Sequence, residues 1–130
     1  MLVRRRKALA GSMLVAIVLV TLLVITATGS AKGGHKISLR ASASGALKYN
    51  KKTIHAKPGK TTFKLTNPGS SGLKHGIEVE GHGAEKRAKN VGPGHSTSVT
   101  LRLKPGTYEF YCPVDGHKAA GMKGKIVVRR

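Results

Sequence analysis

The sequence predicts an all-β domain, an antiparallel β-sandwich or barrel, behind a short apolar leader. Short segments alternate apolar and polar residues, as in "STSVTLRL" (96–103), where Val99, Leu101 and Leu103 would face one side of a strand. Four of the five prolines precede a glycine, and these pairs mark turns between the segments. No stretch after residue 31 has a convincing helical period. Seven or eight short strands in about 99 residues are typical of sandwiches and barrels.

The expected strands in the first half of the domain become clearer along the chain. "KISLRASA" (36–43) and "KTIHA" (52–56) are weak strands, with some β-branched content and little alternation. "TTFKLTN" (61–67) is stronger, because its phenylalanine and leucine alternate with polar residues. It follows "KPG", a turn that stands again before "TYEF", so the same turn leads into a strand twice.

The second half contains the segments with the strongest strand signals. "HGIEVEG" (75–81) alternates apolar residues with glutamates, "TYEFYC" (107–112) is rich in aromatic residues, and "GKIVVRR" (124–130) has β-branched residues. "GAEKRAKNVGPGH" (83–95) is the least patterned segment. We expect it to hold one helical turn or a plain loop.

The first 31 residues differ from everything that follows. Arg4 to Lys7 form a basic cluster, and no charged residue comes after it until Lys32. Such a leader (residues 1–31) is either a secretory signal peptide, cut near Ala31, or a membrane anchor formed by an apolar helix over residues 8–28. Both alternatives stay open. In either case we expect residues 32–130 to form one extracytoplasmic domain, since the positive cluster stays in the cytoplasm.

The domain is strongly basic. Four of the 24 Lys and Arg residues lie in the leader, which leaves 20 against five acidic residues, a net charge of +15. Nucleic acid is the first partner that such a balance suggests. An exported domain meets little of it, however, and aromatic residues that could stack on bases are few. We therefore expect no nucleic-acid partner, and instead an anionic surface of lipid headgroups or cell-wall polymer, or an acidic protein.

The stretch "YCPVDGHKAAGMKG" (111–124) concentrates metal-ligating side chains. Cys112, His117 and Met122 stand with four residues in each gap, in a loop between two expected strands. A lone cysteine cannot form an internal disulfide and, taken singly, is most often a small core residue. His75, at the start of a distant strand, is the best candidate for a fourth donor. A thiolate, two imidazoles and a thioether suit copper that cycles between Cu(I) and Cu(II).

"HGIEVEG" together with "YEFYCPVDGHKAAGMKGKIVV" resembles the cupredoxins, the small blue copper proteins of the plastocyanin, azurin and halocyanin kind. The resemblance implies an eight-stranded Greek-key β-sandwich. It implies one copper ion with His75, Cys112 and His117 as equatorial ligands and Met122 as the axial ligand, and an electron port at the exposed edge of His117. The other histidines lack suitable companions and are assigned to the surface: His35, His55, His82 and His95.

Two residues depart from the family pattern. Many cupredoxins have an asparagine directly after the first histidine ligand, which ties the ligand loops together, whereas Gly76 stands here. We expect its backbone N–H to donate to the cysteine sulfur and the side-chain brace to be absent. Asp115 places a negative charge two residues before His117, on a face that is often apolar in the family.

The leading hypothesis is an extracytoplasmic one-electron carrier, a monomer and not an enzyme. Its positive charge would steer it toward an acidic redox protein such as a cytochrome or an oxidase. A copper carrier or storage protein that delivers copper to an extracytoplasmic oxidase would use similar ligands, so this alternative stays open.

Two further classes are weaker. A multicopper oxidase is disfavoured because the chain has no His-x-His pair, and a cysteine peptidase or transpeptidase because Pro113 suits a closed metal loop better than an open nucleophile. The last alternative is a structural β-domain that binds anionic polymers.

Overall fold

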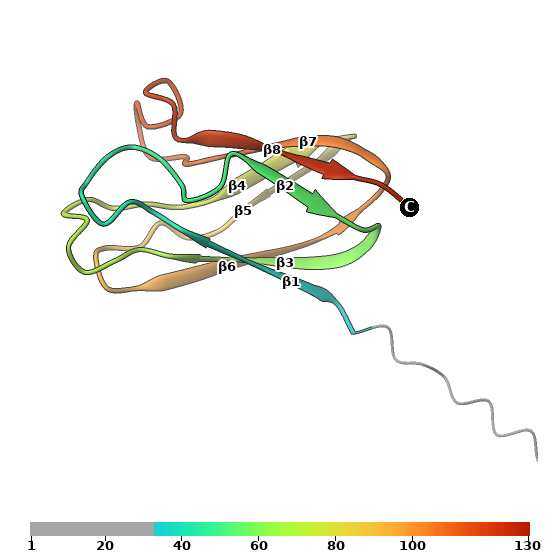
Figure 1. The fold of residues 1–130 in the computed structure, drawn as a ribbon, viewed down its shortest axis with the longest axis horizontal. Coiled ribbons are helices and arrows are strands. Elements are labelled where there is room, and N and C mark those ends of the chain that lie inside the picture. The colour runs from blue at the N-terminus through green and yellow to red at the C-terminus, as the bar shows by residue number, and fades with distance from the viewer. Residues whose placement is uncertain (1–32) are drawn as a thin grey trace, which may run out of the picture. The chain divides into compact units, whose positions relative to one another are not determined.

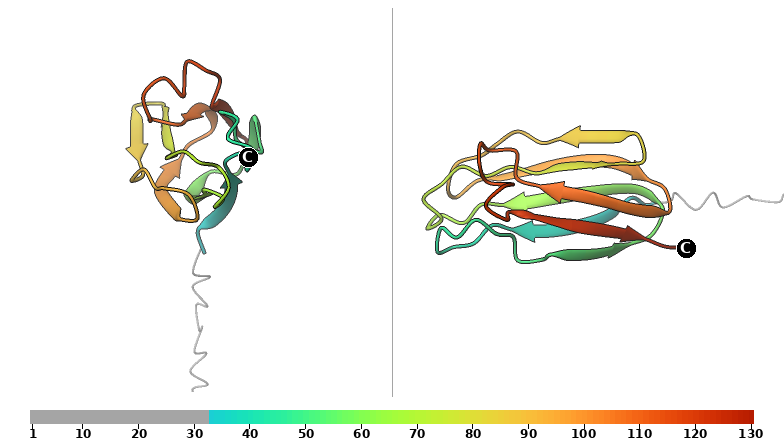
Figure 2. Two further views of the ribbon diagram at one scale, coloured as in Figure 1. Left: turned by 90° about the vertical axis from the view of Figure 1, so that its left-hand side faces the viewer. Right: turned by 90° about the horizontal axis from the view of Figure 1, so that it is seen from above.

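The computed structural model describes residues 33–130, which fold into eight strands in two facing sheets (Figure 1). In chain order the strands are β1 (His35–Arg40), β2 (Thr53–Ala56), β3 (Gly59–Thr66), β4 (Glu78–Gly81), β5 (Ala84–Arg87), β6 (Ser96–Leu103), β7 (Gly106–Tyr111) and β8 (Lys123–Val128). One sheet has the order β1-β3-β6 and the other β2-β8-β7-β4-β5. Figure 2 shows the two layers end on and from above. The predicted all-β sandwich is confirmed.

The core lies between the sheets because each strand turns its apolar residues inward. Phe63 and Leu65 of β3, Phe110 of β7 and Ile126 of β8 are all 0% exposed. Burying such a side chain contributes about 1.5–3 kcal/mol relative to leaving it in water. A one-residue shift of a strand would turn these side chains outward, so the alternation fixes the inner face of each sheet.

Two pairs of neighbouring strands are parallel, which corrects the expectation of a purely antiparallel fold. β1 pairs with β3 and β2 pairs with β8 in parallel, while the remaining neighbours are antiparallel. The chain reverses direction between successive strands, so two odd-numbered or two even-numbered strands run the same way. Because β1, β2 and β3 alternate between the sheets, β1 and β3 become parallel neighbours.

The segment 83–95, expected to be loop or a helical turn, contains strand β5, which pairs with β4. β5 lies at the edge of its sheet and only its first residue, Ala84, packs against the core. Its other residues are exposed Glu, Lys and Arg. Edge strands often contain charged residues of this kind, so the period of apolar residues that reveals an inner strand is missing.

The two ends of the described chain and the loops with the predicted ligands lie at opposite ends of the sandwich (Figure 1). Residue 33, where the described chain begins, and the C-terminus lie toward the same end (Figure 1). The register agrees, since His35 pairs with Thr61 near the start of β3 and Val128 pairs with Gly106 at the start of β7. The loops over residues 67–75 and 112–122 lie at the opposite end (Figure 1). The predicted metal ligands therefore lie far from the point where the leader joins the domain.

The predictions for the leader fall outside the described residues. These are the apolar helix over residues 8–28, the cleavage near Ala31 and the domain boundary after residue 31. Within residues 33–130 we find no helix with the length and apolar character needed to cross a membrane.

Candidate metal centre

The loop between β7 and β8 is closed at its base by backbone hydrogen bonds. The Cys112 N–H donates to the Met122 carbonyl, and the Met122 N–H donates to the His117 carbonyl, both with N···O distances of 3.0 Å. Gly116 and Gly121 adopt φ angles of 77° and 102° within the loop. Such angles are costly for residues with a Cβ, so glycines here allow the tight path. The backbone alone brings three predicted ligands together.

His75 reaches the same place from the segment before β4. It forms an isolated bridge with Val91, in which each backbone N–H donates to the other residue's carbonyl at 3.0 and 2.8 Å. The loop before His75 is held by Asn67, which is 0% exposed. The Asn67 Nδ2 donates to the carbonyls of Leu73 and Val91 at 2.8 and 3.0 Å, and its Oδ1 accepts from Ser71 Oγ at 2.6 Å.

The donor atoms of three predicted ligands converge at this end of the sandwich. The Cys112 Sγ lies 3.9 Å from the His75 Nδ1 and 3.5 Å from the His117 Nδ1. One ligand atom from each of the three residues lies within 4.8 Å of the others, which is the spacing of atoms around one metal ion. His75 and Cys112 are 0% exposed and His117 is 8% exposed. Met122 is 0% exposed in the same loop.

The cysteine sulfur accepts a hydrogen bond from the backbone beside His75. The Gly76 N–H donates to the Cys112 Sγ at 3.4 Å, as expected from the sequence. The Gly76 carbonyl in turn accepts from the buried Tyr49 hydroxyl at 2.7 Å. Both peptide groups that flank the Gly76 Cα are thus held by partners from distant parts of the chain.

Burial shifts the pKa values of Cys112 and His75 in the metal-free protein. It raises the pKa of the Cys112 thiol, and the hydrogen bond from the Gly76 backbone acts in the opposite direction. Burial, with a smaller contribution from His117, lowers the pKa of His75. The His75 imidazole is therefore held neutral, the form that binds metals. Metal binding would release the thiol proton, since a thiolate is the ligand.

The donor set fits copper. A soft thiolate with two imidazoles is the equatorial set of a blue copper site, and a thioether is its usual weak axial donor. Water has little access to the cluster, because His75 and Cys112 are 0% exposed and His117 is 8% exposed. Low solvent access and a fixed backbone donor to the sulfur are features that tune such a metal.

Comparison with known proteins assigns the family. Residues 36–129 match the model described as copper binding proteins, plastocyanin/azurin family. The chain belongs to this family. As predicted, it is a cupredoxin, and the expected cofactor, copper, is the metal of the family.

Two curated relatives match part of this cupredoxin. A chloroplastic plastocyanin of Physcomitrium patens is 34% identical over 92 residues, which cover 65% of this chain and 52% of the relative. The iron uptake system component EfeO of Escherichia coli K12 is 31% identical over 77 residues, or 59% of this chain and 19% of EfeO. The chain thus spans about half the length of the first and about a fifth of the second.

Solved structures of auracyanins share the fold. The dithionite-reduced auracyanin of Roseiflexus castenholzii has a TM-score of 0.63 at 25% identity, covering 75% of this chain and 100% of its own. Auracyanin B has a TM-score of 0.64 at 22% identity, covering 74% of this chain and 89% of its own. At such identity the likeness to auracyanin B concerns the fold alone.

The outcome for the predicted site residues is uneven. The structure brings the donor atoms of His75, Cys112 and His117 together. It places the Met122 backbone beside them and buries its side chain. That these side chains bind the copper ion stays a prediction. Asp115 is exposed, and so are the histidines assigned to the surface: His35, His55, His82 and His95.

Sequence reasoning missed three residues that lie against the ligand segments: Asn67, Tyr49 and Asn90. Asn67 had a detectable signal, because it continues the inward-facing phase of β3 as a polar residue. Tyr49 and Asn90 lie in irregular segments, where no periodicity indicates the direction of a side chain. The Asn90 Oδ1 lies beside Gly76, in the space that a side chain at position 76 would fill.

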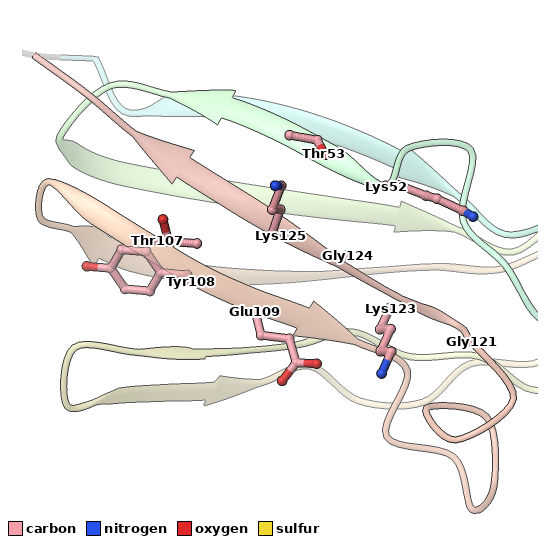
Figure 3. Close-up of a pocket in the computed structure, with 9 residues that line it drawn as sticks. All are labelled: Lys52, Thr53, Thr107, Tyr108, Glu109, Gly121, Lys123, Gly124 and Lys125. Atoms are coloured by element: carbon pink, nitrogen blue, oxygen red, sulfur yellow. The ribbon is translucent and has the colours of Figure 1, made fainter.

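A shallow groove lies apart from the cluster, on the outer surface of β7 and β8 (Figure 3). It has a volume of about 730 Å³ and is lined in part by Lys52, Lys123, Lys125 and Glu109. These residues give the groove a positive surface. The chemistry of the metal cluster does not depend on it, because the cluster is closed inside the end of the sandwich.

Proposed function

We propose that this cupredoxin is an extracytoplasmic one-electron carrier. The observation that carries the proposal is the exposure of the ligands: His117 is 8% exposed while His75 and Cys112 are fully buried. One edge of one ligand then offers a short path between the site and a partner, while solvent is kept from the rest. Copper, when bound, supplies a one-electron couple between Cu(II) and Cu(I).

The four predicted ligands have separate roles in this proposal. The Cys112 thiolate and the imidazoles of His75 and His117 would hold the copper ion, and the Met122 thioether would be a weaker donor. The Gly76 N–H withdraws charge from the sulfur through its hydrogen bond. The closed loop and the buried surroundings would hold the donor side chains in place whether copper is oxidised or reduced.

The surface around His117 suits close approach of a partner. Small residues of the loop are exposed there, namely Gly116, Ala119, Ala120 and Gly121. Leu73, in the loop before His75, is 40% exposed and is the one large apolar side chain exposed within residues 33–130. Small and apolar groups of this kind would let a protein partner exclude water at the electron port, although the exposed Asp115 stands two residues before His117 in the same loop.

The distribution of charge favours an acidic redox partner, such as a cytochrome or an oxidase. Lys74 and Lys123 are exposed beside the ligand loops, whereas Lys118 is engaged by Glu80 and Glu109 at 3.3 and 2.9 Å. The glutamates of the chain lie on β4, β5 and β7. We propose that the domain acts as a monomer. Its positive charge would steer an acidic protein toward it, and the rate of association would fall as the salt concentration rises.

We propose that the domain lies outside the cytoplasm. It would be tethered to the membrane if the leader is retained and released if the leader is cleaved. The chain enters β1 at the end of the sandwich opposite the ligand loops (Figure 1). A tether at that end leaves the His117 edge directed away from the point of attachment.

A second function, copper delivery to an extracytoplasmic oxidase without electron transfer, is kept because of the EfeO match, whose name refers to iron uptake. Stopped-flow mixing of the Cu(II)-loaded full-length protein with a reduced acidic cytochrome separates the two. The carrier proposal predicts rapid reduction that slows as salt rises. Absence of electron exchange, together with transfer of copper to a metal-free acceptor protein, would support delivery instead.

A further inference from the structure

Gly76 and Asn90 face each other beside the metal cluster. His75 and Val91 form a paired bridge, and the chain continues from them to Gly76 on one side and back to Asn90 on the other. A Cβ at Gly76 would overlap the Asn90 Oδ1 and would lie 3.3 Å from the Pro113 Cδ. The Asn90 amide thus occupies the space that the missing side chain of Gly76 leaves open.

This space lies between the two ligand-bearing segments. His75 precedes Gly76 directly, and Cys112 precedes Pro113 directly. The Gly76 N–H that donates to the Cys112 sulfur belongs to the peptide that joins His75 to Gly76. Glycine restricts its own backbone less than any other residue. The carbonyl of this peptide accepts from the Val91 N–H at 2.8 Å, and the Asn90 amide lies beside the Gly76 Cα as a second group that restricts the peptide.

The Asn90 oxygen has no hydrogen-bond donor. Within residues 33–130 the buried side-chain N and O atoms without a partner are the His75 Nε2 and the Asn90 Oδ1. An unpaired buried polar atom has lost its hydrogen bonds to water without replacement, so the amide oxygen does not add to the stability of the fold. Both unpaired atoms belong to segments joined by the His75–Val91 bridge. Unsatisfied buried groups in a native fold call for an explanation, and a functional site is one.

We propose that Asn90 is a positioning residue of the copper site. Its side-chain amide reaches from the segment opposite Gly76, packs between the His75 and Cys112 segments and keeps the Gly76 N–H directed at the cysteine sulfur. Asn90 thus supplies, across the His75–Val91 bridge, the side-chain brace that is absent at position 76. This inference rests on the proposed copper function, because the sulfur is positioned for the metal.

The test compares full-length Asn90→Ala with Asn50→Ala as a matched control. The Asn50 Oδ1 accepts from the Arg40 N–H at 2.9 Å, so that amide is satisfied and supports a loop. Asn90→Ala is expected to leave the urea midpoint of the copper-free protein unchanged or higher, and to speed hydrogen exchange of the Gly76 N–H. It should shift the visible absorption of the Cu(II) form and speed copper loss about 10-fold, the size typical of residues that orient ligands. Asn50→Ala should lower the urea midpoint and leave the absorption unchanged.

A double variant tests whether the amide itself matters. Gly76→Asn alone should disrupt the site, because its Cβ would meet the Asn90 Oδ1 and Pro113. Gly76→Asn combined with Asn90→Gly moves the amide to the other side of the same space and should return copper retention toward the parent value. The proposal is overturned if Asn90→Ala leaves both absorption and copper loss unchanged, or changes them only in step with lost stability. If the parent protein has no intense absorption with Cu(II), the proposed function fails first.

Discussion

The hydrogen bond from Tyr49 to Gly76 offers a direct test of how the ligand segments are supported. Tyr49 is 5% exposed, and its hydroxyl donates to the Gly76 carbonyl at 2.7 Å. Burial, with the nearby Cys112, raises the pKa of the Tyr49 hydroxyl far above its ordinary value, so the group stays protonated and remains a donor. Tyr49→Phe removes this donor and keeps the ring, which packs on Phe110 with centroids 5.4 Å apart.

The expected loss follows from the carbonyl left behind. A buried carbonyl without a donor costs about 1–3 kcal/mol. For a domain of this size about 1 kcal/mol corresponds to roughly 4–8 °C in the thermal midpoint. We therefore expect Tyr49→Phe to lower the midpoint of the copper-free protein by roughly 5–20 °C. The ring contacts are retained, so the slope of urea unfolding should stay the same.

Urea and thermal unfolding of the copper-free protein, followed by circular dichroism, measure this loss. Tyr111→Phe is the matched control, because the Tyr111 hydroxyl donates to Glu80 at 3.3 Å near the surface. A surface change of this kind is expected within about 0.5 kcal/mol of the parent. The reasoning is refuted if Tyr49→Phe is no more destabilising than Tyr111→Phe.

Three other predictions follow from single contacts. Gly124→Ala should destabilise the fold by about 1–3 kcal/mol, since its Cβ would lie 2.5 Å from both the Lys52 carbonyl and the Phe110 ring, and equal urea midpoints would contradict this. The Lys118 hydrogen bond lowers the pKa of Glu80, so this pair stabilises the fold at neutral pH and loses its effect as pH falls through the lowered pKa. Lys118→Met should raise the Glu80 pKa in an NMR titration, and an unchanged value would exclude the ion pair in solution. Met122→Gln should lower the copper reduction potential in a voltammetric measurement, because a harder oxygen donor favours Cu(II); an unchanged potential would remove Met122 from the ligand set.

The sequence predicts the strands well where a buried face imposes a period of two. β6 matches the predicted range 96–103, and β3 and β7 differ from prediction by only a few residues at their ends. β5 was missed because only Ala84 of that edge strand contacts the core. The two parallel pairings depend on which sheet each strand joins, and local alternation contains no information about that choice.

The candidate site divides in the same way. Cys112, His117 and Met122 lie in one short loop, so their spacing predicts their proximity. His75 is the best candidate for a fourth donor because it opens a distant strand, and the family resemblance supports that choice. The residues that lie around the ligands, Tyr49 and Asn90, could not be predicted from sequence spacing. Tyr49 and Asn90 lie far from the ligands in sequence and are brought to Gly76 only by the paired segments around it. The absence of a side chain at Gly76 was visible in the sequence, and the residue that fills its place was not.

The central claim, a buried His75–Cys112–His117 copper centre, is tested most directly by adding Cu(II) to the copper-free full-length protein and recording its visible spectrum. We predict one copper ion per chain and an intense absorption from thiolate-to-copper charge transfer, which Cys112→Ser abolishes. A spectrum with only the weak absorption of copper bound by nitrogen and oxygen, or one that Cys112→Ser leaves unchanged, would contradict the account.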